Sequence, residues 1–359
     1  MNLQEFKTNC MVDLNTQVQT EYQTPRLKQL FFEVTSRCNL YCKHCGSSCD
    51  IGQRDGISVL KMQSVLQDIL NDSEYRDHKP FIILTGGEPM LRSDFFDIAE
   101  LLYNMGFKWG MTTNGTLITP ERAKMLRDFG MYSVSISIDG LRSRHDAFRQ
   151  KQGAFDKALR GVESLIDVGG FGNIMVTTVL THESLKEIDD IFNLVNTLDI
   201  DCWRVASVEP IGRALSHPEM NFTDEDYRFL LDYIVEKRKQ NIPVQYGCAH
   251  YLGLNYEREV RDWFYRCVSG VEVASIMQNG DIGGCLNIER TKSVIQGNIY
   301  KDRLLDIWRN KFEIFRTDLS THTDKCVDCE HKMFCRGGNH HTYDHEHNRQ
   351  NLCMRGVLF

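Results

Sequence analysis

The stretch CNLYCKHC at residues 38–45 holds three cysteines in eight residues, directly after the apolar run LFFEVT at Leu30–Thr35. A short apolar run of this kind predicts a buried strand. The spacing C-x3-C-x2-C leaves a four-ligand metal site one thiol short. The next residues, GSSC, offer Cys49 as a fourth thiol. The spacing alone therefore leaves two interpretations open: a four-cysteine zinc or iron–sulfur site, or a cluster with one open position.

Beyond this stretch, apolar runs alternate with segments of helical periodicity. The predicted strands are Leu30–Thr35, Phe81–Thr85, Trp109–Thr113, Tyr132–Ile138, Ile174–Leu180 and Trp203–Val208. The predicted helices are Ser58–Leu70, Asp94–Tyr103, Pro120–Phe129, Ala154–Val168, Ser184–Leu198 and Thr223–Gln240. Six strand–helix units predict an α/β fold, a partial (β/α)6 barrel with parallel strands. In such folds the chemistry lies at the carboxyl ends of the strands.

The pattern changes after residue 240. Val271–Cys285 predicts a hairpin that turns at Asn279-Gly280, and Arg303–Asn310 predicts a short helix. The tail from Cys326 is rich in cysteine and histidine. We expect an N-terminal extension over 1–27, the barrel over 28–240, a bridging linker over 241–265 and a small cysteine-rich α+β module over 266–359.

The composition narrows the class of protein. A net charge of −7 over 359 residues argues against binding of nucleic acid through phosphate contacts. The chain has no run of 18 apolar residues and no secretory signal pattern, so we expect no membrane insertion and a cytoplasmic location. Thirteen cysteines in a reducing compartment indicate metal sites rather than disulfides.

A second motif, TGGEP at Thr85–Pro89, ends the second predicted strand at the same rim of the sheet. Gly86 and Gly87 would let a ligand approach the backbone, and Glu88 could accept a hydrogen bond from an ammonium group. A C-x3-C-x2-C loop after the first strand and GGEP after the second together resemble the radical S-adenosylmethionine (radical SAM) superfamily. The resemblance covers the chain from residue 28 onward.

The resemblance implies cofactors and chemistry. Cys38, Cys42 and Cys45 would hold a 4Fe–4S cluster, and the amino and carboxylate groups of S-adenosylmethionine would bind its fourth iron. A one-electron donor of the flavodoxin or ferredoxin type would reduce the cluster. Reductive cleavage of S-adenosylmethionine would give a 5′-deoxyadenosyl radical, which removes a hydrogen atom from the substrate.

The same resemblance assigns residues to the cofactor. Gly86, Gly87 and Glu88 would contact its methionine part, and Asn114 lies in TTNGTL after the third strand. Ser137 in SISIDG and Arg149 in HDAFR match positions that touch the ribose and the carboxylate. The alternative for each is ordinary turn chemistry at a strand end.

The C-terminal cysteines resemble the SPASM extension of radical SAM enzymes, which carries auxiliary iron–sulfur clusters. We expect at least one auxiliary 4Fe–4S cluster, and three ligand arrangements stay open. The first uses Cys326, Cys329, Cys335 and Cys353; a second site could use Cys267 and Cys285; a twitch-like arrangement joins Cys267 and Cys285 to Cys326 and Cys329. The family's further cysteine is replaced by Asn339. A zinc knuckle is the structural alternative.

Two polar features complete the candidate set. The tract HHTYDHEH holds His340, His341, His345 and His347 and is expected to be a solvated loop rather than a metal site. Glu209 follows the sixth strand and is expected either to bind substrate or to pair with Arg213.

The SPASM resemblance points to a peptide or small protein as substrate. Leu286 follows Cys285 where sulfatase-maturing members carry an aspartate, so that activity is not expected. The alternative enzyme is a heme-pathway radical SAM enzyme that removes side-chain carboxylates from a tetrapyrrole. A second alternative is a non-catalytic iron–sulfur protein, which would need neither an open iron nor a site for S-adenosylmethionine.

Overall fold

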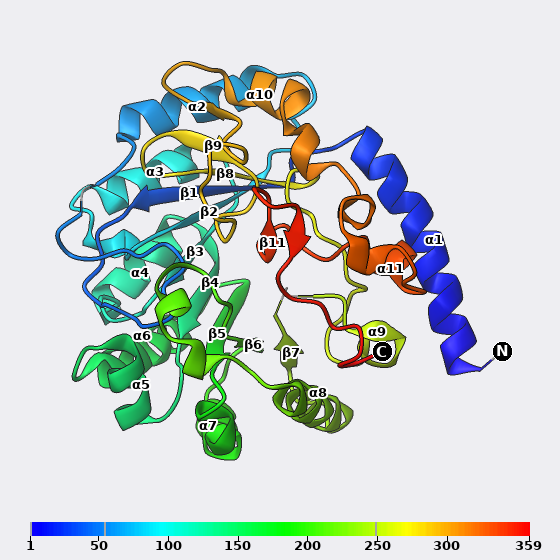
Figure 1. The fold of residues 1–359 in the computed structure, drawn as a ribbon. Coiled ribbons are helices and arrows are strands. Elements are labelled where there is room, and N and C mark those ends of the chain that lie inside the picture. The colour runs from blue at the N-terminus through cyan, green and yellow to red at the C-terminus, as the bar shows by residue number, and fades with distance from the viewer. Residues whose placement is uncertain (1, 54, 248–249) are drawn as a thin grey trace.

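A computed structural model describes residues 2–53, 55–247 and 250–359, so Cys248 lies outside the described residues. Within these ranges, ten strands form one sheet in the order β10-β9-β8-β1-β2-β3-β4-β5-β6-β7. Strands β1 to β7 run parallel and curve into an open, partial barrel (Figure 1). They are β1 Gln29–Thr35, β2 Phe81–Gly86, β3 Trp109–Thr113, β4 Met131–Ser137, β5 Asn173–Leu180, β6 Cys202–Ser207 and β7 Val244–Tyr246.

Helices connect the parallel strands and lie outside the sheet (Figure 1). They are α2 Val59–Asn71, α3 Phe95–Asn104, α4 Pro120–Asp128, α5 Arg142–Arg149, α6 Ala154–Val168, α7 Ile188–Val195 and α8 Asp224–Lys239. Side-chain caps define several starts: the Thr119 hydroxyl accepts from the Arg122 N–H, and Thr223 forms a capping box with Asp226. The predicted helix at Ser184–Leu198 begins as a 3-10 turn and ends at Val195.

One apolar core joins the strands to these helices. It includes Phe32, Leu84 and Trp109 from the sheet and Val162 and Leu231 from the helices, all buried. Burial alternates along β5, as expected for successive residues that point to opposite faces. The core therefore fixes the strands, and their carboxyl ends carry the loops described below.

The N-terminal extension, for which the sequence predicted no helix, is mostly helical. Residues Leu3–Gln23 form helix α1, which lies beside α9 Gly253–Tyr256 and α11 Lys332–Cys335 (Figure 1). Met11 and Val18 are buried, and the buried Lys7 ammonium lies 2.7 Å from a Glu259 carboxylate oxygen. Distant parts of the chain supply these contacts, so local sequence gave little sign of the helix.

The sheet continues through both predicted C-terminal segments. The expected linker 241–265 contributes β7, which pairs with β6. The predicted hairpin forms as β8 Val273–Ile276 and β9 Asp281–Gly283, and Gly280 in its turn has φ +89°. Strand β8 pairs in parallel with β1, and β10 Gly297–Asn298 pairs with β9. The sheet continues across residues 240 and 265 through β7 and β8. The domain boundaries at these two residues remain predictions.

The rest of the C-terminal part is built from short elements. They are α10 Leu304–Asn310, close to its predicted range, α11, and a small ladder of β11 Tyr343–Asp344 with β12 Arg349–Gln350. A search of the described helices finds none with the length and apolar character that a membrane crossing requires.

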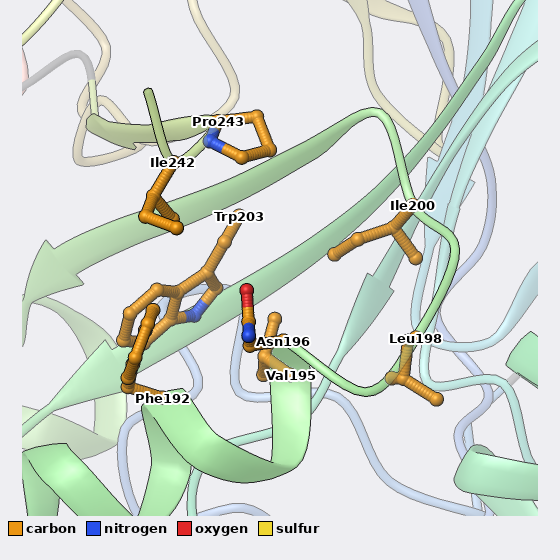
Figure 2. A pocket seen from close by; sticks show the side chains of 8 residues that line it. All are labelled: Phe192, Val195, Asn196, Leu198, Ile200, Trp203, Ile242 and Pro243. Atoms are coloured by element: carbon orange, nitrogen blue, oxygen red, sulfur yellow. The ribbon is translucent and has the colours of Figure 1, made fainter. Parts of the chain in front are cut away.

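A cavity of about 40 Å³ lies at the amino ends of β6 and β7 (Figure 2). Its lining is Phe192, Val195, Asn196, Leu198, Ile200, Trp203, Ile242 and Pro243. These residues are mostly apolar and lie at the end of the sheet away from the cysteine loop. The cavity is thus a packing feature of the fold, and the chemistry is sought at the opposite strand ends.

Candidate functional site

The three-cysteine loop leaves the end of β1 and is held by helix α5. The Tyr41 and Lys43 N–H groups donate to the carbonyl oxygens of Arg149 (3.3 Å) and Phe148 (3.0 Å). Cys38 and Cys42 are buried and form one apolar cluster with Cys45, Cys49, Leu40 and Ala154. The structure therefore gathers the three predicted ligands together with Cys49.

The surroundings of these thiols suit a bound metal group. Burial raises the pKa of Cys38 to about 12 and also raises the pKa of Cys42, so burial disfavours the thiolate form of these two side chains. A metal that replaces the thiol protons compensates the charge of buried thiolates. A set of soft sulfur donors fits an iron–sulfur cluster. No three acidic, histidine or cysteine side chains of the described residues already converge as a metal site, so the ligand assignments stay predictions.

Gly86 and Gly87 pack against the start of the cysteine loop. A Cβ on Gly86 would lie 2.1 Å from the Thr35 carbonyl oxygen, and one on Gly87 would lie 2.1 Å from that of Arg37. Backbone hydrogen bonds hold the same contact. The Gly87 N–H donates to the Thr35 carbonyl oxygen at 2.8 Å, and the Glu88 N–H donates to the Arg37 carbonyl oxygen at 2.8 Å. The glycines thus allow two backbones to meet. Contact with a cofactor remains a prediction for both.

Glu88 is fully buried and joins the end of β2 to the loop after β3. Its carboxylate accepts hydrogen bonds from the Thr113 hydroxyl (2.8 Å), the Asn114 N–H (2.8 Å) and the Met90 N–H (3.3 Å). Burial raises its pKa. These donors already use the carboxylate that sequence reasoning reserved for an ammonium group, so Glu88 also has a positioning role.

Asn114 lies against the cysteine loop. Its amide nitrogen donates to Asn39 Oδ1 over 2.9 Å and lies 3.9 Å from Cys38 Sγ. Its Oδ1 accepts from the Thr116 N–H and hydroxyl groups. Asn114 therefore lies where a group bound beside Cys38 would meet it.

Arg149 and Asp139 form a buried ion pair between α5 and the end of β4. Arg149 Nε donates to Asp139 Oδ2 over 2.6 Å, and Asp139 Oδ1 accepts from the Val179 N–H over 2.9 Å. Burial raises the pKa of Asp139, but Arg149, His44, His145 and the Val179 hydrogen bond together outweigh it and leave that pKa below its usual value. Burial raises the pKa of the nearby Cys42, and the charge of Arg149 offsets part of that rise. Ser137 ends β4 next to this pair and is half-buried.

Of the two alternatives for Glu209, the pairing with Arg213 is wrong, and substrate binding stays a prediction. Arg213 does not pair with Glu209; its guanidinium donates to the carbonyl oxygens of Cys42 (2.8 Å) and Cys49 (3.0 Å). It also stacks on the Tyr41 ring at 4.0 Å. Arg213 thus clamps the cysteine loop from the segment after β6. Its place soon after a predicted strand was the only signal in the sequence.

Glu209 instead contacts the C-terminal tail. Its Oε1 lies 2.8 Å from His341 Nε2 and 4.0 Å from His250 Nε2. The expectation of a solvated histidine loop is wrong for His340 and His341, which are buried. His340 stacks on His345, whereas His347 is exposed and pairs with Asp344. The tail therefore contacts the segment after β6 through His341.

The four C-terminal cysteines Cys326, Cys329, Cys335 and Cys353 are near enough to influence one another electrostatically. Burial, with a smaller effect of Cys353 and Cys329, raises the pKa of Cys326 to about 11, and burial together with the other three members also raises the pKa of the half-buried Cys335. Cys267 packs in the same apolar cluster as Cys335. Cys285 follows β9, and its N–H donates to the Ser269 hydroxyl. This grouping is consistent with the first ligand arrangement.

Asn339, which stands where the family has a further cysteine, has hydrogen-bonding partners of its own. It is buried, its amide nitrogen lies 3.0 Å from His250 Nδ1, and its Oδ1 accepts from the Thr342 N–H. The side chain thus orders the tail at this position.

Comparisons with known proteins agree with this geometry. The profile of the radical SAM superfamily matches residues 32–195, and that of the SPASM iron–sulfur cluster-binding domain matches residues 267–330. An AdoMet-dependent heme synthase of Nitratidesulfovibrio vulgaris is 30% identical over 339 residues, 89% of each chain. The chain belongs to the radical SAM superfamily. It therefore uses a 4Fe–4S cluster and S-adenosylmethionine, and its SPASM domain carries auxiliary iron–sulfur clusters.

A further relative and two solved structures are also similar to this chain. The mycofactocin maturase MftC of Mycolicibacterium smegmatis is 31% identical over 315 residues, 86% of this chain and 77% of the relative. Streptococcus suis SuiB bound to S-adenosylmethionine superposes with a TM-score of 0.70 at 19% identity, covering 87% of this chain and 73% of SuiB. The enzyme anSMEcpe, bound to AdoMet and a peptide, gives a TM-score of 0.70 at 19% identity, covering 91% and 92%. These two structures support the fold alone.

Proposed function

We propose that this radical SAM enzyme modifies a peptide or small protein by removing a hydrogen atom from one of its carbons. When bound, the cluster and S-adenosylmethionine supply the one-electron chemistry for that step. The chain's own part is to hold both groups, orient the substrate and exclude water.

The proposal gives each predicted site residue a task. Cys38, Cys42 and Cys45 hold the cluster. Gly86, Gly87, Glu88, Asn114, Ser137 and Arg149 surround S-adenosylmethionine. Arg149 is fixed by Asp139 and offers positive charge to the cofactor's carboxylate. Cys326, Cys329, Cys335 and Cys353 hold an auxiliary cluster, with Cys267 and Cys285 as candidates for a further site.

A cavity beside the cysteine loop supports a peptide as substrate. It measures about 230 Å³ and lies at the carboxyl ends of β4 and β5. Its lining is Lys43, Asp139, Arg144, Ala147, Phe148, Thr181, Glu183, Ser184, Glu219 and Met220. Pockets for drug-sized ligands measure roughly 300–1,000 Å³, so this space suits one inserted side chain better than a macrocycle.

The charges around the cavity support the same proposal. Three carboxylates and two cationic side chains line it. Of the cations, Arg144 is held by Glu187 through contacts of 2.8 Å and 2.5 Å. A substrate with several carboxylates would meet little free positive charge here, whereas neutral or basic peptide side chains would be accommodated.

The similarity to the heme synthase, 30% identity over 89% of both chains, supports a second candidate. In this alternative the enzyme removes side-chain carboxylates from a tetrapyrrole. The cavity would then have to widen and expose additional cationic groups.

One experiment separates the two candidates. The anaerobically reconstituted enzyme receives dithionite and S-adenosylmethionine, with either an iron porphyrin that bears propionates or the peptide fraction of a lysate from the source cells. We expect peptides alone to raise 5′-deoxyadenosine formation severalfold and to change mass. Loss of carbon dioxide and two hydrogens from the porphyrin, with no modified peptide, would establish the tetrapyrrole alternative instead.

The electron donor and location belong to the proposal as well. A cytoplasmic flavodoxin or ferredoxin would supply single electrons, and replacing dithionite with such a donor tests this directly.

A further inference from the structure

The cysteine loop contains a fourth thiol that the three-cysteine motif does not use. Cys49 is buried, and it shares one apolar cluster with Cys38, Cys42 and Cys45. Cys49 Sγ lies 3.7 Å from the Ser47 carbonyl oxygen, and the half-buried Cys45 packs against the cluster that contains Cys49 and Cys38. Cys49 therefore faces the predicted metal ligands and not a separate part of the core.

The backbone holds Cys49 in this place. The Ser48 N–H donates to the Cys45 carbonyl oxygen over 3.3 Å, and Ser48 has φ +51°, so GSSC turns back on the loop. Arg213 Nη1 donates to the Cys49 carbonyl oxygen over 3.0 Å, and the Cys38 N–H donates to that of Asp50 over 3.0 Å. These backbone contacts hold Cys49 close to Cys38, Cys42 and Cys45.

Three buried thiols, with the half-buried Cys45 packed against them, are as many cysteines as a fully thiolate-bound cluster takes as ligands. A 4Fe–4S cluster held by three cysteines leaves one iron open, and a nearby thiolate is a soft ligand suited to it. We propose that Cys49 binds the fourth iron of the first cluster until S-adenosylmethionine displaces it. In the exchange, the Cys49 thiolate leaves and takes up one proton from solvent while the amino and carboxylate groups bind; no electron is transferred.

This inference rests on the family of the protein and not on its substrate. It predicts that Cys49 competes with S-adenosylmethionine. Where the thiolate-bound form outnumbers the open form by about ten to one, removal of the thiol tightens cofactor binding by about tenfold. A thiol that only fills the core would leave both binding and cluster spectra unchanged.

The test uses reconstituted wild-type enzyme, C49S, C49A and a matched control, C202S. Cys202 is also a buried cysteine, but it begins β6 at the opposite end of the sheet. Equilibrium dialysis measures the Kd of S-adenosylmethionine, and electron paramagnetic resonance follows the reduced clusters with and without it. Auxiliary-cluster signals are common to all variants and cancel in difference spectra.

We expect both Cys49 variants to bind S-adenosylmethionine about tenfold more tightly. Their spectra should differ from wild type without the cofactor and coincide with it after addition, while C202S matches wild type throughout. Unchanged Kd and spectra in the Cys49 variants would overturn the proposal, as would loss of the first cluster from both variants.

Mössbauer spectra of the ⁵⁷Fe-loaded wild-type enzyme provide a test that does not depend on variant folding. Four equivalent thiolate-bound irons before S-adenosylmethionine and one distinct iron after it are expected. A distinct iron already present before addition contradicts a Cys49 ligand.

Discussion

At the scale of single residues, the site depends on groups whose role is to position the cysteine loop. Gly86, Arg213 and Asp139 contact that loop or the residues that hold it, and none of them has to touch a substrate. Their substitution should therefore alter the site through its geometry.

Gly86→Ala should destabilise the protein and reduce its iron content. The new Cβ would lie 2.1 Å from the Thr35 carbonyl oxygen, at φ +144°. Gly153→Ala is the control, because Gly153 also has a positive φ, +76°, but no atom lies within 4 Å of its Cβ position. Both variants should carry a backbone strain of about 1–3 kcal/mol, but only Gly86→Ala should also suffer the steric clash. Thermal unfolding and iron counts check this; equal losses in the two variants would contradict it.

Asp139→Asn should lower the free energy of unfolding by about 3–5 kcal/mol, because Arg149 loses its partner in a buried pair. The half-exposed pair of Arg144 with Glu187 provides the control: Glu187→Gln should cost about 1 kcal/mol or less. Urea unfolding measures both. Similar losses of unfolding free energy in the two variants would contradict a larger contribution from the buried pair.

The native pKa of Asp139 lies below its usual 3.8, which fixes the sign of the pH dependence. Its contribution to stability is fully present above that usual pKa and is lost as the pH falls through the lower native value. The Asp139→Asn variant should therefore lose less stability on acidification than the wild type does.

At the scale of elements, local sequence patterns predicted the barrel but not the segments that are stabilised by contacts with distant parts of the chain. The bounds of β3 and α6 match the prediction, because compact apolar runs and helical spacing set them locally. Helix α1 was missed because its few buried side chains find partners about 250 residues away, as Lys7 does in Glu259. The short strand β7 was missed because three residues give little periodicity.

Helix α1 should stabilise the C-terminal part through Met11. This side chain packs in one cluster with Tyr251, Leu254 and Tyr265. Met11→Ala should cost about 2–5 kcal/mol, since it leaves a cavity in that cluster. Val12→Ala, on the exposed face of the same helix, is the control. Hydrogen exchange over residues 251–265 reports the effect, and unchanged protection would argue that α1 is dispensable there.

At the scale of the whole molecule, the sheet joins the two cysteine-rich regions into one body. Strand β8, from the C-terminal part, pairs with β1, whose end begins the first cysteine loop. Glu209 connects the segment after β6 to His341 of the tail. The motifs predicted the cysteine sites, but the contacts of Glu209, His341 and Arg213 span more than a hundred residues and could not be read from local sequence.

The central claim is that the first cysteine loop holds a cluster that cleaves S-adenosylmethionine. It is tested by counting iron and assaying dithionite-driven 5′-deoxyadenosine formation in the anaerobically reconstituted wild type and in a variant with Cys38, Cys42 and Cys45 changed to alanine. We expect about eight irons for one radical and one auxiliary cluster, or about twelve with a second auxiliary cluster. The variant should lose about four of them and all cleavage. An iron-loaded wild type that forms no 5′-deoxyadenosine would contradict the account.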